Sequence, residues 1–118
     1  KGAQTLLSTI LTATIIARYT ALAHDPNPLH QDPVAARVAG FADVIAPGML
    51  LCALAEAAYV RLNPGSKIQE LRARFLSPAK VNTSVQVVVA AQAGAKSRVF
   101  VVSEAQDIHA IVDVFTPA

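Results

Sequence analysis

A carboxylate and an imidazole lie close together in the segment H-D-P-N-P-L-H, residues 24–30. Both side chains, Asp25 and His30, are of types that commonly act as general acids and bases. The two prolines of the segment exclude a helix, because each ring removes an N–H group and clashes with the carbonyl one turn earlier. We therefore predict a stiff loop that holds both groups on one target, with Asn27 bracing the turn. An ordinary surface turn has a similar composition, so residues elsewhere must decide between the two interpretations.

A second feature that can do chemistry is Gly48, the first residue of an apolar run that is rich in helix formers and ends at Leu62. The run predicts a helix over residues 48–62. The first N–H groups of a helix have no partner inside the helix and carry partial positive charge. Because glycine has no side chain to keep a ligand away, we expect the Gly48 N–H to stabilise negative charge on a substrate carbonyl oxygen.

The helix over residues 48–62 is apolar nearly all round. At about 22 Å it is too short to cross a bilayer, so we expect protein to cover it. Glu56, two turns into the helix, is therefore expected to be buried, where it pairs with an arginine or faces a binding pocket. Met49, Leu50 and Tyr59 fit a core better than a pocket.

The remaining elements are short. We expect a strand over residues 6–11, then a helix that Thr12 caps, and another helix that begins at Asp32-Pro33 and ends at Gly40. In the second half of the chain, apolar and charged residues alternate in one segment, and three further segments are rich in Val, Ile or Phe. These patterns predict four strands with short connections and hence an antiparallel sheet. These strands cover residues 69–75, 85–91, 98–105 and 110–115.

A sheet that curls around the long helix is the simplest way to bury it. The sequence thus predicts an α+β hot-dog fold, with residues 1–118 as one domain.

Residues 5–23 imitate a secretory signal, with the basic Lys1 before them. Arg18 and six Ser or Thr residues interrupt the apolar run and argue against a signal. The chain lacks an initial Met, so a preceding strand could be missing.

Composition excludes several classes of function. Hydrophobic residues make up 53% of the 118 residues and charged ones 15%. We expect an oligomer whose subunit interface covers part of the apolar surplus. The net charge of +2 has no basic cluster, which argues against nucleic acid and is compatible with a phosphate-bearing small molecule. Cys52 is the single cysteine and no Cys/His set has metal-ligand spacing, which predicts a metal-free site in a reducing compartment, the cytoplasm.

Several motifs follow one another along the chain: Tyr19, D-P-N-P-L-H at 25–30, Gly40-Phe41, I-A-P-G-M-L at 45–50, and Arg74-Phe75 with Pro78. In this order they resemble the MaoC-like, R-specific enoyl-CoA hydratases. The resemblance extends over nearly the whole chain. It implies a hot-dog dimer of fatty acid metabolism, outside the membrane. The implied reaction is the reversible syn addition of water to a trans-2-enoyl thioester to give the (R)-3-hydroxyacyl thioester, with no cofactor.

The resemblance also implies roles for individual residues. Asp25 and His30 are expected to hold a water molecule, with Asp25 as the base, while the Gly48 N–H polarises the thioester carbonyl. Further substrate contacts are expected from Asn27, Pro47 and Met49, and the substrate is an acyl-CoA or acyl-carrier-protein thioester.

Three positions depart from the family pattern. His24 replaces the glycine that usually precedes the catalytic aspartate, and we expect it to have a structural role or to lie on the rim of the site. Pro47 replaces a histidine before the helix, which removes a side-chain donor and an N–H group from the carbonyl end. Asn82-Thr83 replaces a Gly-Asp turn.

Two other functions stay open. One is a hot-dog thioesterase, in which water attacks the carbonyl carbon. The other is a non-catalytic acyl-thioester binder or one half of a heterodimer. His109 is expected in a solvated turn. The arginines and lysines of the sheet either contact coenzyme A phosphates or are simply solvated; they are Arg72, Arg74, Lys80, Lys96 and Arg98.

Overall fold

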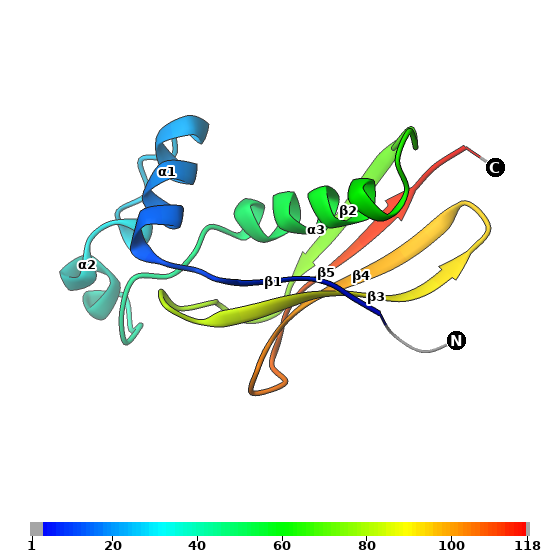
Figure 1. The fold of residues 1–118 in the computed structure, drawn as a ribbon. Helices are drawn as coiled ribbons and strands as arrows, with labels where there is room; N and C mark the ends of the chain where they lie inside the picture. The colour runs from blue at the N-terminus through cyan, green and yellow to red at the C-terminus, as the bar shows by residue number, and fades with distance from the viewer. Residues whose placement is uncertain (1–3, 118) are drawn as a thin grey trace.

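The computed structural model describes residues 4–117, in which a five-stranded antiparallel sheet lies against one long helix (Figure 1). This architecture confirms the predicted hot-dog arrangement. Lys1, the basic residue of the signal-like pattern, lies outside the described residues. The strands are β1 (Gln4–Ile10), β2 (Glu70–Phe75), β3 (Ser84–Ala93), β4 (Lys96–Ser103) and β5 (Ile108–Phe115).

The order of strands across the sheet, β1-β3-β4-β5-β2, differs from their order in the chain. Short connections join β3, β4 and β5, as predicted. The strand β2 does not lie beside β3, which follows it in the chain, but at the sheet edge beside β5, with Glu70 opposite Phe115. The place beside β3 is taken by β1 from the start of the chain. The two edge strands are therefore set by long-range pairing.

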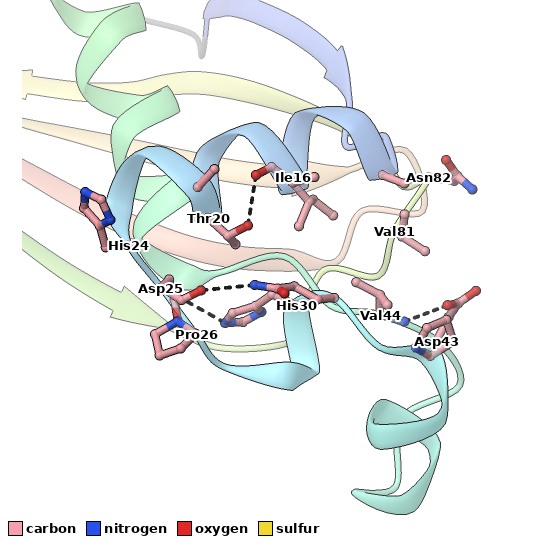
Figure 2. A pocket seen from close by; sticks show the side chains of 15 residues that line it. Ile16, Thr20, His24, Asp25, Pro26, His30, Asp43, Val44, Val81 and Asn82 are labelled. Atoms are coloured by element: carbon pink, nitrogen blue, oxygen red, sulfur yellow. Dashed lines mark hydrogen bonds and ion pairs between the residues drawn. The ribbon is translucent and has the colours of Figure 1, made fainter.

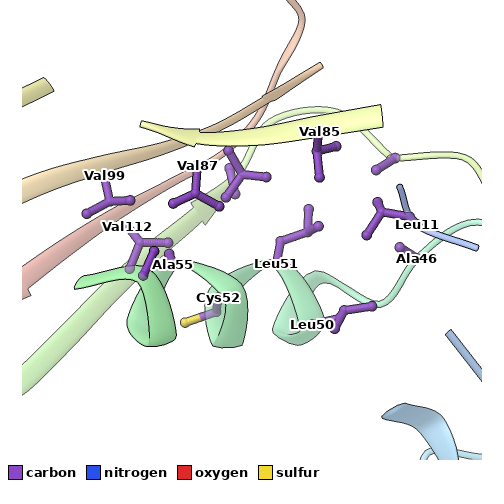
Figure 3. Packing of buried hydrophobic residues seen from close by; sticks show 14 of the residues in the cluster. Leu11, Ala46, Leu50, Leu51, Cys52, Ala55, Val85, Val87, Val99 and Val112 are labelled. Carbon is purple, nitrogen blue, oxygen red and sulfur yellow. The ribbon is translucent and has the colours of Figure 1, made fainter. Parts of the chain in front are cut away.

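Valines at alternate positions line the face of the sheet that packs on the long helix, α3 (Gly48–Leu62) (Figure 3). Leu51 and Ala55 of α3 are buried against this face. Full burial of a Val or Leu side chain contributes about 1.5–3 kcal/mol, so this contact anchors the helix. The buried valines are Val85, Val87, Val89, Val99, Val101, Val112 and Val114.

The sheet covers one face of α3 rather than the whole helix, which corrects part of the sequence-based expectation. Glu56, expected to be buried, is exposed. Met49 is 58% exposed and Val60 41% exposed on the same helix. The expectation was wrong because an apolar composition does not say which face meets the sheet. Leu50 and Tyr59 are buried in the core, as predicted. Within residues 4–117, no helix has the length and apolar character to cross a membrane.

The helix before the Asp25 loop, α1 (Ala13–Ala23), begins where the sequence predicts. The Thr12 hydroxyl accepts a hydrogen bond from the Ile15 amide at 3.2 Å, which satisfies one of the free N–H groups of the first turn. Ile16 of α1 is buried in the core. Leu22 is 82% exposed, because the last turn of α1 extends beyond the core.

A short 3-10 helix, η1 (Pro28–His30), and α2 (Pro33–Val38) follow. Pro28 is the first residue of η1, where proline is tolerated, so the prolines exclude a longer helix but not this single turn. The Asp32 carboxylate accepts a hydrogen bond from the Val34 amide at 2.9 Å, and Pro33 is the first helical residue, as predicted. Gly40 ends this segment with a φ of +100°, which side chains rarely adopt. Helices α1 and α2 lie together beyond the N-terminal end of α3 (Figure 1).

Candidate active site

The Asp25 loop is stiff because its polar groups bond to one another. The Asn27 amide donates to the Asp25 carboxylate at 3.1 Å, and the Asn27 side-chain oxygen accepts from the Leu29 amide at 3.0 Å. The Asp25 amide donates to the carbonyl of Thr20 at 2.9 Å, which ties the loop to α1. Asn27 therefore braces the turn, as the sequence predicts.

His24 occupies the point where α1 ends and the loop begins. Its backbone is left-handed, with φ 53° and ψ 42°, and it serves as the C-cap of α1. This conformation is easy for glycine and costs other residues energy. The left-handed backbone accounts for the glycine that the MaoC-like pattern usually has where this chain has His24. His24 is exposed and lies at the edge of the cavity described below, which agrees with a structural or rim position.

His30 is oriented by the backbone that leads to α3. Its Nδ1 atom lies 2.8 Å from the carbonyl oxygen of Ile45, and the Ile45 amide donates to the Leu29 carbonyl at 3.1 Å. A carbonyl oxygen only accepts hydrogen bonds, so we assign the proton of the neutral ring to Nδ1. The Nε2 atom then carries a free lone pair.

Asp25 and His30 face each other (Figure 2). The His30 Nε2 atom lies 3.7 Å from a carboxylate oxygen of Asp25, and the two side chains are 30% exposed for Asp25 and 10% exposed for His30. This separation is longer than a hydrogen bond. It is short enough for one water oxygen to reach both atoms. The structure therefore brings the predicted acid–base pair together.

The pair lines a cavity of about 930 Å³ (Figure 2). Ile16 and Thr20 of α1 form one wall, and Val44 and Val81 contribute apolar surface facing it. Such a cleft, mostly apolar with a few polar groups, is typical of a site for a small organic ligand.

The start of α3 lines a different cavity, of about 270 Å³. Pro47 caps the helix without any side-chain hydrogen bond, and among the described residues no partner is found for the Gly48 amide. A Cβ atom at Gly48 would lie 3.1 Å from the Phe75 ring, so only glycine fits there without a shift. The structure thus assigns Gly48 and the Asp25–His30 pair to separate cavities.

A short stretch of chain links the residue that orients His30 to the residue that begins α3. Ile45, whose carbonyl orients His30, precedes Gly48 by three residues. Three residues span at most about 11 Å, which bounds the distance between their Cα atoms.

The other three residues predicted to contact the substrate do not line the cavity of the Asp25–His30 pair. Met49 is 58% exposed, and neither Met49 nor Pro47 lines either cavity. The side-chain oxygen of Asn27 already accepts the Leu29 amide.

His109, expected in a solvated turn, is 5% exposed and lies within β5. Its Nδ1 atom lies 3.0 Å from the Ser77 hydroxyl oxygen and 3.2 Å from the Ser77 carbonyl oxygen. The expectation was wrong because β5 begins earlier than predicted and the segment after β2 covers its start. The period-two pattern of Ala110, Val112 and Val114 places His109 on the opposite face and so gave no signal of this burial.

Three basic residues of the sheet lie within ion-pair distance of acidic neighbours, namely Arg72, Lys96 and Arg98. Arg98 makes two hydrogen bonds to the Asp113 carboxylate, at 2.8 and 2.9 Å. These bonds, followed by the charges of Arg98, Lys96 and Arg74, hold the pKa of the Asp113 carboxyl below its usual value. Arg72 pairs with Glu70 and lies over the Phe115 ring.

The remaining groups to place are metal-ligating side chains and the thiol of Cys52. Within residues 4–117, no group of three His, Cys, Asp or Glu side chains is close enough to hold a metal ion. Cys52 is buried in α3, and burial, together with the Glu56 carboxylate, raises the pKa of its thiol.

Comparison with known proteins finds relatives that are dehydratases of 3-hydroxyacyl thioesters. The mitochondrial 3-hydroxyacyl-(acyl-carrier-protein) dehydratase FERN of Solanum lycopersicum is 53% identical over 36 residues, which are 30% of this chain and 22% of that protein. A mitochondrial 3-hydroxyacyl-(acyl-carrier-protein) dehydratase of Arabidopsis thaliana is 31% identical over 76 residues, 64% of this chain and 46% of that protein. Each match spans less than half of the relative's length.

The solved structure of an (R)-hydratase from A. caviae, involved in PHA biosynthesis, superposes with a TM-score of 0.83. It is 24% identical, and the match covers 99% of this chain and 97% of that chain. At this identity the likeness shows a shared fold. A family model described as MaoC like domain matches residues 4–112. Since that match extends over most of the sequence, the chain belongs to the MaoC-like dehydratase family.

Proposed function

We propose that this chain is a hydro-lyase that adds water, with syn geometry, to trans-2-enoyl thioesters and forms (R)-3-hydroxyacyl thioesters, or catalyses the reverse dehydration. The observation that carries this proposal is the Asp25–His30 pair, 3.7 Å apart in a largely apolar cavity. The names of the relatives, dehydratases of 3-hydroxyacyl thioesters and an (R)-hydratase, support the same reaction class.

The orientation of His30 gives Asp25 and His30 different roles in the proposed reaction. With its Nδ1 proton donated to Ile45, the Nε2 lone pair accepts one hydrogen of the water molecule. The Asp25 carboxylate accepts the other hydrogen and removes it as the water oxygen bonds to the β-carbon. The electrons of the double bond move to the thioester carbonyl as an enolate. Protonated Asp25 then returns the proton to the α-carbon on the same face, which regenerates the carboxylate.

The enolate oxygen needs a stabilising donor, and the free Gly48 N–H at the start of α3 supplies it. Gly48 follows Ile45, whose carbonyl orients His30, by three residues, so this proposal requires the substrate to extend from the cavity of the pair to the start of α3. Asn27 remains in the proposal through the loop it braces, and Pro47 and Met49 remain in it through their positions on either side of Gly48 in the chain.

The substrate carrier is coenzyme A or an acyl carrier protein, and the working form is a homodimer. The dimer is supported by large apolar side chains that stay exposed, such as Met49 and Val60 of α3. The single buried Cys52 fits a reducing compartment such as the cytoplasm.

Incubation with crotonyl-CoA tests the reaction. Loss of the enoyl absorbance without release of free thiol is the expected result. The Asp25→Asn and His30→Ala variants should be slower by about 100- to 10,000-fold, because the first removes the base and the second removes the acceptor that orients the water molecule. Asp43→Asn is the matched control. Asp43 is a carboxylate of the same cavity whose oxygen accepts the Val44 amide, a bond that the amide variant can keep.

The same assay separates the alternatives. Release of thiol would indicate a thioesterase, and no reaction with measurable thioester binding would indicate a non-catalytic subunit. If Asp25→Asn and His30→Ala hydrate crotonyl-CoA as fast as the unmodified protein, the assignment of the pair is wrong.

A further inference from the structure

The cavity of the Asp25–His30 pair is larger than the proposed reaction requires. Its volume is about 930 Å³. Cavities of about 300–1,000 Å³ hold drug-sized ligands. Hydration itself involves only the carbonyl group, the α-carbon and the β-carbon of a thioester. Most of the cavity is therefore left for a further part of the ligand.

One face of α1 forms a long wall of this cavity. The lining residues of the helix recur at intervals of three and four, which is the spacing of a single helical face. They are Ala13, Ile16, Ala17, Thr20 and Ala21. From Ala13 to Ala21 the helix rises by about 12 Å. The cavity is thus an elongated groove along more than two turns of α1.

The groove is polar at its ends and apolar between them. Asp25 lies where α1 ends, and Asn82 lies at the opposite end, near the start of α1 (Figure 2). The side chains between them include Ile16 of α1 and, facing it, Val44 and Val81. This order suits an alkyl chain that has its reacting end at Asp25 and its methyl end before Asn82.

We propose that the groove along α1 binds the acyl chain, so that the preferred substrates are medium-chain enoyl thioesters, and that the alanines of α1 set the limit on chain length. This inference rests on the proposed function, which places the β-carbon at the Asp25–His30 pair. The carbons beyond the β-carbon are then left for the groove. A carbon–carbon bond advances a chain by at most about 1.5 Å. About eight bonds therefore extend along a groove of about 12 Å, which corresponds to an acyl chain of about ten carbons.

Three substrates test the length in the unmodified protein: crotonyl-CoA, trans-2-decenoyl-CoA and trans-2-hexadecenoyl-CoA. We expect kcat/KM to be at least about tenfold higher for the decenoyl than for the crotonyl substrate, because each buried methylene group improves binding by up to about fourfold. It should fall again for the hexadecenoyl substrate, whose end extends past the groove. Equal values for crotonyl and decenoyl, or a further rise to hexadecenoyl, would overturn the inference.

Variants of α1 test where the chain lies. Ala17 is one helical turn, about 6 Å, from Ala21, so Ala17→Phe fills the groove beyond about four bonds. We expect it to lower the decenoyl-to-crotonyl ratio of kcat/KM about tenfold and to keep the hexenoyl-to-crotonyl ratio. Ala13→Phe, one turn farther from the pair, should lower the decenoyl ratio and keep the octenoyl ratio.

Ala23→Phe is the matched control, because Ala23 is exposed on the same helix and does not line the cavity. It should leave every ratio unchanged. If Ala13→Phe, Ala17→Phe and Ala23→Phe change the ratios by the same factors, the lining face of α1 does not contact the acyl chain and the inference is wrong.

Binding without turnover keeps this inference separate from the proposed function. The saturated thioesters butyryl-CoA and decanoyl-CoA cannot be hydrated, and their affinities can be measured by NMR titration. If the protein hydrates no enoyl thioester but binds decanoyl-CoA at least about tenfold more tightly, and Ala17→Phe removes this preference, the proposed reaction fails and the acyl groove stands. Hydration of crotonyl-CoA with no length preference in either measurement would support the reaction and overturn the groove.

Discussion

In the Asp25–His30 pair, each side chain uses one polar atom for a structural hydrogen bond. The Ile45 carbonyl holds the Nδ1 edge of His30 at 2.8 Å, which leaves Nε2 facing Asp25. The Asn27 amide holds one oxygen of Asp25 and leaves the other toward His30. Each residue therefore has one structural and one free polar atom. This division is what allows the two free atoms to bind the same water molecule.

His24 gives the first stability prediction. Because its φ is 53°, replacement by glycine removes the cost of a left-handed side-chain-bearing residue, about 1–2 kcal/mol. Part of that gain is offset by the greater freedom of glycine in the unfolded chain. We expect His24→Gly to raise the free energy of unfolding by about 0.5–1 kcal/mol, measured by urea denaturation. His24→Ala keeps the unfavourable backbone and should bring no gain; equal effects of the two variants would contradict this explanation.

Among the secondary-structure elements, η1 holds the Asp25 loop through its N-cap residue, Asn27. Asn27→Ala removes the oxygen that accepts the Leu29 amide and should lower the free energy of unfolding by about 1 kcal/mol. It should also slow hydration, because the loop that orients Asp25 loosens. Asn27→Ser keeps a capping oxygen and should restore most of both. An Asn27→Ala variant with full stability and reduced activity would instead indicate direct substrate contact.

The pairing of β4 with β5 gives a prediction about pH. Hydrogen bonds from Arg98 lower the pKa of Asp113 in the folded state, so the charged form stabilises the fold. That contribution is present above the pKa of the unfolded chain, about 4, and is lost as the pH falls through the lower folded value. We expect Asp113→Asn to cost about 1 kcal/mol at pH 7 and progressively less below about pH 4, in denaturation curves at several pH values.

The Glu70–Arg72 pair is a control for that prediction. Its side chains are 48% exposed for Glu70 and 68% exposed for Arg72, and exposed ion pairs contribute little. Glu70→Gln should change the stability by less than about 0.5 kcal/mol at any pH. A loss of stability in Asp113→Asn that is the same at about pH 3 and about pH 7 would show that packing, and not charge, is responsible.

For the whole molecule, the exposed apolar face of α3 predicts self-association. The chain has a mass of 12.4 kDa, and sedimentation should give twice that value at micromolar concentrations. Val60→Lys should shift the protein toward monomer, because a charge at an apolar interface must be desolvated. Val34→Lys, on α2 and also exposed, is the matched control. A monomeric unmodified protein, or dissociation by Val34→Lys alone, would contradict an interface on α3.

Local features of this protein are determined by its sequence alone. The bounds of α3, the caps at Thr12 and Asp32 and the bracing role of Asn27 were predictable. Each depends on residues within one or two helical turns, whose hydrogen bonds and backbone limits do not require the rest of the fold. The closeness of Asp25 and His30 was predictable for the same reason, since prolines leave their loop few conformations.

Features that join distant segments were decided only by the tertiary structure. The sheet position of β2, the exposure of Glu56 and the burial of His109 all depend on which surfaces meet. The period-two and helical patterns say that an element has an apolar face, but not which neighbour covers it. His109 is buried because Ser77, more than thirty residues earlier, lies over the start of β5. A single sequence carries no local signal of such a contact, because its free energy appears only when both segments are in place.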